Sequence, residues 1–248
     1  MTRIGILQTD SVREEFREAF GSYPDMFRSL LSRAAADASV PVEFELFDVE
    51  HGEYPDEIDA CDGYVITGSR ESVYDDLPWI ETLSDYVRAL HAARKKTVGV
   101  CFGHQLVAHA LGGETRAADA GWGVGVHRMR ILADEPWMRP QLPAVSLLSS
   151  HKDQVVRMPP GARLLGSNDF CPIGSFALGD HFLTLQGHPE FEKGYARALM
   201  TFRESLLGDA YAPGIASLSR PTDEAAVGRW MLRFLAGGAV SDRGAPAR

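Results

Sequence analysis

The segment Gly99–Gln105 constrains the fold of this 248-residue chain more than any other stretch. It reads Gly-Val-Cys-Phe-Gly-His-Gln, follows an apolar strand-like run and precedes a helix-like run that a glycine pair ends. A cysteine with a glycine two residues before it and another two residues after it is typical of a sharp turn from a strand into a helix. The start of a helix carries partial positive charge, which favours the thiolate form of Cys101. The sequence therefore predicts an activated cysteine at a strand-to-helix corner.

The first half of the chain alternates between strand-like and helix-like segments. Strands are expected at residues 4–8, 42–49, 63–67 and 97–101, and helices in the later part of 12–36 and over 78–90. This alternation predicts an α/β fold of the flavodoxin-like, doubly wound kind with a mostly parallel sheet. The second half predicts an additional antiparallel or mixed strand region, with strands at 124–132, 144–149, 163–166, 174–178 and 181–186 and helices near 191–206 and 223–235.

Composition bounds the class of protein. No linker, repeat or low-complexity segment divides the chain, so we expect residues 1–237 to form a single domain and residues 238–248 a disordered tail. A net charge of −9 argues against nucleic acid and acidic membranes as partners. No run of residues approaches the length of a membrane span. Three irregularly spaced cysteines do not make a disulfide framework, and a cytoplasmic location is expected.

Three predicted strand ends carry groups that can do chemistry, namely Gly68, Cys101 and the His-Pro-Glu segment at 188–190. In open α/β sheets, ligands bind beyond the carboxyl ends of the strands. A cysteine nucleophile needs a base, and the base needs a group that orients it. His188 can be the base. Because the proline after it favours an extended backbone, Glu190 is expected on the same side and within reach of the imidazole.

An acyl-transfer reaction also needs hydrogen-bond donors for an oxyanion. The backbone N–H of Phe102, which follows the cysteine, is one candidate, and Gly68 at the neighbouring strand end is the second. Gln105 lies four residues beyond Cys101 on the predicted helix. Its side-chain amide has a donor and an acceptor for an amino-acid-like ligand.

Each of these pieces also has an ordinary structural interpretation. A lone cysteine in an apolar strand is usually a small buried hydrophobe, and this is the interpretation for Cys61 and Cys171. Glycine-rich turns are weak signals, and a His-Pro-Glu segment is often a surface turn. His104 and His109 are five residues apart, which is poor spacing for a shared helical face, so no metal site is expected. The combination favours catalysis because each piece supplies a role that the others lack.

The Gly-x-Cys-x-Gly-x-Gln motif around Cys101, followed much later by His-Pro-Glu, resembles the class I, triad-type glutamine amidotransferases. The resemblance is greatest to the stand-alone branch that is similar to the glutaminase domain of GMP synthase. Further similarity lies at 66–69, 72–76, 78–79 and 150–155, so the resemblance runs over about residues 4–206.

The resemblance implies a γ-glutamyl thioester on Cys101, with ammonia released and water then hydrolysing the thioester. It makes His188 the acid and base and Glu190 the residue that orients His188. It places the oxyanion between the amides of Gly68 and Phe102, although this chain has Thr-Gly-Ser where many members have a glycine pair.

The resemblance also implies that Gln105 and the backbone around Lys152 and Asp153 hold the α-amino and α-carboxylate ends of glutamine. No cofactor is implied. Because no synthase domain or phosphate-binding loop is evident, either a separate synthase subunit accepts the released ammonia or there is no acceptor. Some stand-alone members look like γ-glutamyl peptidases, which use the same triad, and this alternative stays open. The hypothesis from a different functional class is that the protein is not an enzyme but a catalytically silent, flavodoxin-like binding protein.

Overall fold

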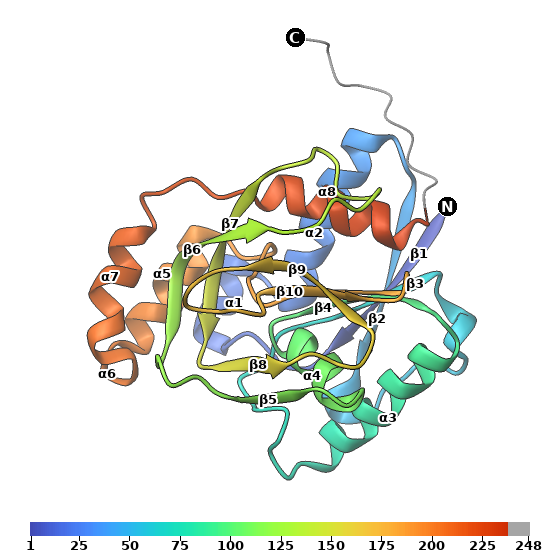
Figure 1. The fold of residues 1–248 in the computed structure, drawn as a ribbon, viewed down its shortest axis with the longest axis horizontal. Helices are drawn as coiled ribbons and strands as arrows, with labels where there is room; N and C mark the ends of the chain where they lie inside the picture. The colour runs from blue at the N-terminus through green and yellow to red at the C-terminus, as the bar shows by residue number, and fades with distance from the viewer. Residues whose placement is uncertain (238–248) are drawn as a thin grey trace.

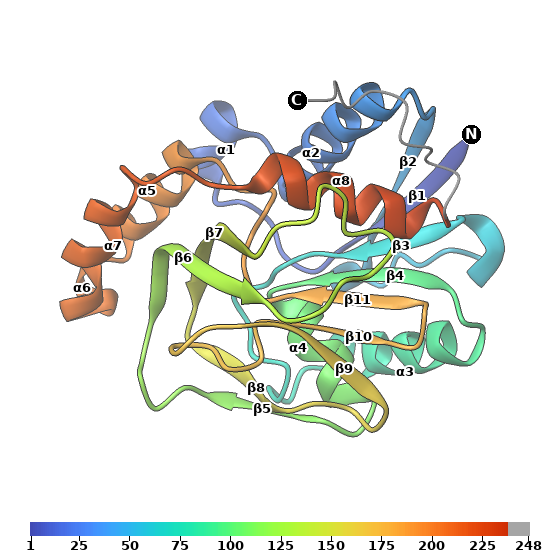
Figure 2. The ribbon, with the colours of Figure 1, turned by 45° about the horizontal axis from the view of Figure 1, so that its top comes forward.

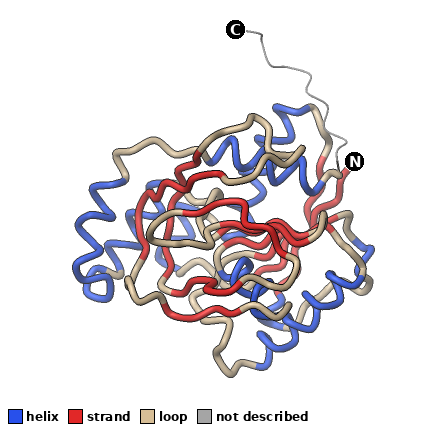
Figure 3. Tube along the Cα trace, in the orientation of Figure 1, coloured by secondary structure: helices blue, strands red, loops and turns tan. Residues whose placement is uncertain are grey.

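The computed structural model describes residues 1–237, and a nine-stranded sheet runs through its centre (Figures 1 and 3). In spatial order the strands are β2 (Val42–Asp48), β1 (Thr2–Gln8), β3 (Gly63–Ile66), β4 (Lys96–Val100), β11 (Phe182–Leu185), β10 (Ser175–Leu178), β9 (Ala162–Ser167), β6 (Gly123–Ile131) and β7 (Ala144–His151). Pairing is parallel from β2 to β11 and antiparallel from β11 to β7. The predicted doubly wound α/β fold with an antiparallel extension is confirmed, and the extension adds four strands to the five parallel ones.

Helices cover both faces of the parallel part (Figure 2). The helices α2 (Tyr23–Ala38) and α8 (Glu224–Leu235) pack on one face, and α3 (Pro78–Ala92) and α4 (Phe102–Ala110) pack on the other. The side chains of β1 alternate accordingly: Ile4 and Ile6 join the core under α2 and α8, whereas Leu7 joins the core under α3 and α4. This burial of both faces is what a parallel sheet requires.

A third group of helices gathers at the β6–β7 side of the sheet (Figures 1 and 2). It contains α1 (Glu14–Phe20), α5 (Lys193–Phe202), α6 (Glu204–Leu207) and α7 (Tyr211–Ser217). Their apolar side chains form a separate core with β6 and β7, to which Phe191, Tyr195 and Leu199 belong. Short 3-10 helices lie at Val49–His51, Ile58–Ala60 and Gly208–Ala210.

The structure differs from the sequence prediction in three local features. The helix expected in the later part of 12–36 is α2, but a second helix, α1, precedes it; the two are separated at Gly21, whose φ of 73° suits glycine. A small antiparallel pair, β5 (Glu114–Ala117) and β8 (Asp153–Arg157), was not predicted, because β5 is polar and its partner lies far along the chain. The helix α7 was not predicted either, since it contains a proline and a glycine. The predicted tail 238–248 lies outside the described residues.

The strand order fixes where a ligand site belongs. From β1 the chain winds outward to β2 and then back past β1 to β3, so the direction of winding reverses between β1 and β3. In doubly wound sheets, ligands bind beyond the carboxyl ends of the strands at this reversal. Thr9 follows β1, Thr67 follows β3, and Cys101 follows the adjacent strand β4.

Candidate active site

Cys101 stands at the corner between β4 and α4. Its backbone has φ 52° and ψ −102°, a conformation that residues with a side chain rarely adopt and that costs about 1–3 kcal/mol. A Cβ built on Gly99 would lie 2.5 Å from the carbonyl oxygen of Gly103, and one built on Gly103 would lie 2.6 Å from the carbonyl oxygen of Ile66. Neither glycine can carry a side chain while the corner keeps this shape. The predicted sharp turn is therefore present, for the predicted reason.

His188 and Glu190 lie beside this corner, in the loop after β11. Nδ1 of His188 is 2.7 Å from Oε1 of Glu190, and both side chains are buried. The backbone N–H of His188 donates to the carbonyl oxygen of Leu148 at 2.7 Å, which ties the loop to β7. A Cβ built on Gly68 would lie 3.1 Å from Cε1 of His188 and 3.6 Å from Cβ of Cys101, so the loop after β3 packs against both residues.

The surroundings of His188 favour its charged form. Burial by itself lowers the pKa of His188, but the Glu190 carboxylate and, next, the Cys101 sulfur together raise that pKa to about 10. Within residues 1–237, Nε2 of His188 is buried and has no hydrogen-bond partner. Because Nδ1 is held by Glu190, Nε2 is the ring nitrogen that can exchange a proton with a nucleophile or a leaving group.

An aromatic stack supports the imidazole of His188. The ring of Phe191 lies 3.9 Å from it at an interplanar angle of 10°, and the ring of Tyr23 stacks on Phe191 at 6.1 Å. Tyr195 meets Phe191 edge-on at 4.8 Å, and the hydroxyls of Tyr23 and Tyr195 are 2.8 Å apart. The helices α2 and α5 thus fix the plane of the imidazole, and an aromatic face favours its cationic form.

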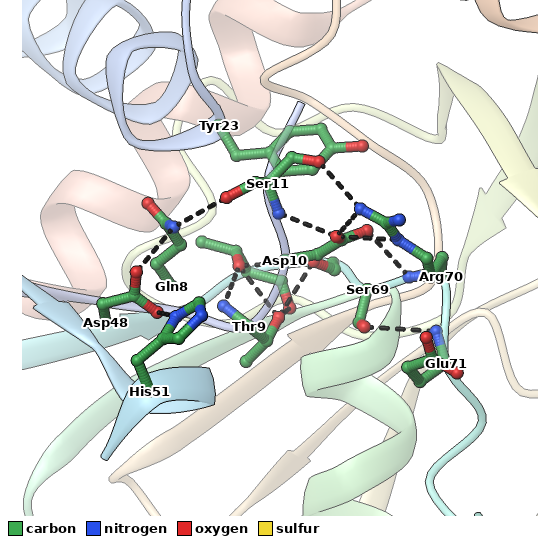
Figure 4. Close-up of polar contacts among 12 residues, drawn as sticks. Gln8, Thr9, Asp10, Ser11, Tyr23, Asp48, His51, Ser69, Arg70 and Glu71 are labelled. Carbon is green, nitrogen blue, oxygen red and sulfur yellow. Dashed lines mark hydrogen bonds and ion pairs between the residues drawn. The ribbon is translucent and has the colours of Figure 1, made fainter. Parts of the chain in front are cut away.

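The loop that carries Gly68 is tied to the loop after β1 (Figure 4). The N–H of Thr9 donates to Oγ1 of Thr67 at 3.0 Å, and the Thr9 hydroxyl donates to the carbonyl oxygen of Gly68 at 2.9 Å. The buried carboxylate of Asp10 accepts from Nε of Arg70 at 2.9 Å and from the Arg70 N–H at 3.1 Å. These bonds connect the loops after β1 and β3, the two strands between which the direction of winding reverses. They hold the Gly68 backbone next to the corner at Cys101.

Phe102 follows Cys101 at the start of α4, and its ring lies in the core. The ring packs against Trp79 with 5.5 Å between centroids, and the side chain is buried. As the first residue of α4, Phe102 has no carbonyl group one turn earlier in the helix to which its N–H could donate. An N–H of this kind, next to a nucleophile, is a suitable oxyanion donor.

Two clefts meet at Cys101. The wider one, of about 190 Å³, is lined by Cys101 together with Gln105, Lys152 and Asp153. The narrower one is lined by Cys101 together with Gly68, His188 and Glu190. With Phe102 adjacent in the chain, the structure brings the other seven residues that the sequence singled out around Cys101.

Gln105 and Asp153 already hold parts of the wider cleft together. Nε2 of Gln105 donates to the carbonyl oxygen of Asp153 at 2.8 Å and to Oε1 of Gln186 at 3.2 Å. The Asp153 carboxylate accepts from the Ser72 hydroxyl at 2.5 Å and from the Tyr74 hydroxyl at 2.9 Å. In this arrangement the side-chain amide of Gln105 has only its oxygen, Oε1, left for a ligand. The Asp153 carboxylate connects the loop after β3 to β8.

Several residues of the site were not selected from the sequence. Asp10 follows the first predicted strand, and the strand-end argument that selected Gly68 applies to it equally. Phe191 directly follows the His-Pro-Glu segment, but nothing in a single sequence says that its ring stacks on His188. Arg70 and Arg203 line both clefts, and the placement of Arg203 depends on how α5 packs.

Known proteins match both the sequence and the fold. The family model of class-I glutamine amidotransferases matches residues 23–206. The chain is 33% identical over 188 residues to γ-glutamyl peptidase 3 of Arabidopsis thaliana, and the match covers 73% of each chain. It is 33% identical over 143 residues to a glutamine-hydrolysing GMP synthase subunit of Sulfolobus acidocaldarius, covering 56% of this chain and 74% of that one. A glutamine amidotransferase structure from Thermotoga maritima superposes with a TM-score of 0.70 at 18% identity, over 97% of this chain and 99% of that one.

The chain therefore belongs to the class I glutamine amidotransferase family, an enzyme family, as the resemblance of its motifs implied. The superposition independently supports the fold, a large mixed sheet flanked by helices. Among residues 1–237, no helix combines the length and apolar character needed to cross a bilayer.

Proposed function

We propose that this protein is a hydrolase that cleaves the γ-amide of glutamine through a γ-glutamyl thioester on Cys101. One observation carries the proposal: a buried His188–Glu190 pair, 2.7 Å apart, lies beside a cysteine in a strained corner at the start of a helix. Family membership supports the reaction class. The cleft lining has both signs of charge, as a zwitterionic amino-acid end requires.

The proposed reaction has two halves. In the first, His188 holds the proton of Cys101, and the thiolate attacks the γ-carbonyl carbon. The N–H groups of Gly68 and Phe102 stabilise the oxyanion. The C–N bond then breaks as Nε2 of His188 gives the proton to the departing nitrogen, so ammonia leaves and the thioester remains.

In the second half, water replaces the departed amine. His188 takes a proton from the water, which attacks the thioester carbonyl carbon, and the C–S bond breaks. The sulfur leaves as thiolate paired with the protonated His188, so the enzyme returns to its starting state and glutamate is released. Glu190 keeps the imidazole oriented throughout. Gln105 and the backbone at Lys152 and Asp153 hold the glutamyl end.

A γ-glutamyl peptidase is the second candidate. The similarity to γ-glutamyl peptidase 3 of Arabidopsis thaliana favours it, and the same residues would perform the same two steps with a peptide amine as leaving group. The similarity to part of a GMP synthase supports the first candidate, together with a separate synthase subunit that takes up the ammonia. The three free cysteines suit a reducing compartment, and we place the protein in the cytoplasm.

An end-point assay of free glutamate distinguishes the candidates. The purified protein is incubated with glutamine and, separately, with several γ-glutamyl dipeptides. We expect glutamate release that Cys101→Ala abolishes, with Cys171→Ala as a matched control that keeps activity. Turnover of glutamine alone supports the amidotransferase-type hydrolase, and preference for dipeptides supports the peptidase. Release of glutamate from none of the substrates would favour a silent binding protein.

A further inference from the structure

Arg203 occupies the junction of the two clefts. It is the residue at the C-terminal end of α5, it is half-buried, and it lines both clefts together with Cys101. Its Nη1 is 3.4 Å from the hydroxyl of Ser150, to which it donates, and its guanidinium lies 5.9 Å from the ring centroid of Trp122. These contacts keep the guanidinium near the nucleophile.

Several charged side chains around Arg203 already have partners in the protein. Arg70 forms an ion pair with the buried Asp10. The Asp153 carboxylate is bound by two hydroxyls, and Glu71 and Lys152 add one charge of each sign to the wider cleft. Within residues 1–237, no carboxylate forms an ion pair with Arg203. A half-buried guanidinium without an anion beside it has donors to offer a ligand.

We propose that Arg203 binds a carboxylate of the substrate. The guanidinium presents a planar fork of N–H donors that matches a carboxylate in two bonds. Because Arg203 lines both clefts together with Cys101, its guanidinium lies in the region where a group near the reacting carbonyl would be held. The proposal rests on the proposed function, because that function supplies a γ-glutamyl substrate.

A γ-glutamyl substrate offers two carboxylates that Arg203 could bind. Every γ-glutamyl compound carries the α-carboxylate of its glutamyl part, and γ-glutamyl peptides carry a second one at the C-terminus of the departing amine. Arg203 can also interact with the carbonyl groups at the end of α5 without any ligand, because a cation is favourable there. A purely structural role of that kind predicts a loss of stability and no change in substrate affinity.

The test compares glutamine, γ-glutamylglycine and the C-terminal amide of γ-glutamylglycine as substrates of Arg203→Gln. We expect KM to rise at least about tenfold while kcat changes little, as for loss of a charge-assisted hydrogen bond. A rise with γ-glutamylglycine alone identifies the carboxylate of the departing amine, and a rise with all three identifies the α-carboxylate. Arg203→Lys should recover part of the affinity, because it keeps the charge without the fork.

Arg197→Gln is the matched control, since Arg197 lies exposed on the same helix and lines neither cleft. It should leave KM and Tm unchanged. Unchanged KM for every substrate in Arg203→Gln would overturn the proposal, and so would a drop in Tm and kcat at constant KM. If the wild-type protein releases no glutamate from any of the three substrates, the proposed function itself fails, which is a different result.

Discussion

At the scale of single residues, the site depends on the charge of His188, which Glu190 and Cys101 influence. His188 is buried, and burial alone would lower its pKa; the Glu190 carboxylate and the Cys101 sulfur reverse the effect and raise the pKa to about 10. The pKa of His188 in the folded protein therefore lies above the pKa of an unperturbed histidine, which is about 6.5. Protonated His188 contributes its full stabilisation of the fold at pH values below about 6.5. That contribution is lost as the pH rises toward 10.

The order of these two influences predicts a titration result. Glu190→Gln should lower the pKa of His188 more than Cys101→Ala does, because the carboxylate is the stronger of the two favourable influences. The measurement is the pH dependence of the imidazole nitrogen shifts of His188 by NMR in the wild type and both variants. A wild-type pKa near 6.5, unmoved by either substitution, would show that the three residues do not form a charged network.

At the scale of elements, the site is assembled from loops that three helices position. The helix α4 places the corner, whereas Tyr23 of α2 and Tyr195 of α5 hold Phe191, whose ring stacks on His188. Phe191 is a positioning residue, because it contacts the imidazole and not the reacting atoms.

Removing the stack should slow the reaction without unfolding the protein. Phe191→Leu should lower kcat by between about twofold and thirtyfold, the range that loss of a cation–π contact of about 0.5–2 kcal/mol gives. It should also shift the pH profile of kcat/KM, because the imidazolium loses its aromatic partner. Phe191→Tyr keeps the ring and should keep the profile. An unchanged pH profile in Phe191→Leu would assign the residue to packing alone.

The sequence predicted the parts of the site that follow local rules. Glycines around Cys101, strand ends and the His-Pro-Glu segment each have a local reason for their identity, and the structure brings those residues together. Arg203 and the Tyr23–Phe191 stack could not be predicted, because helices far apart in the chain must pack before these side chains meet. The β5–β8 pair was missed because β5 is polar and its partner lies far along the chain.

At the scale of the whole molecule, the strand order explains why the site is where it is. The winding reverses between β1 and β3, and the loops after β1, β3 and β4 meet at that edge of the sheet. The antiparallel part contributes through β7, which carries Ser150 to the clefts, and the separate β5–β8 pair contributes Asp153 through β8. Both halves of the sheet thus line the clefts that meet at Cys101.

The covalent intermediate is the most direct test of this chemistry. The wild-type protein is mixed with glutamine or a γ-glutamyl dipeptide, quenched in acid during turnover, digested and analysed by mass spectrometry. We predict that the peptide containing Cys101 gains the mass of one glutamyl group, and that hydroxylamine removes it. Glutamate release with no acyl group on Cys101, or with the group on Cys61 or Cys171, would contradict the proposed mechanism.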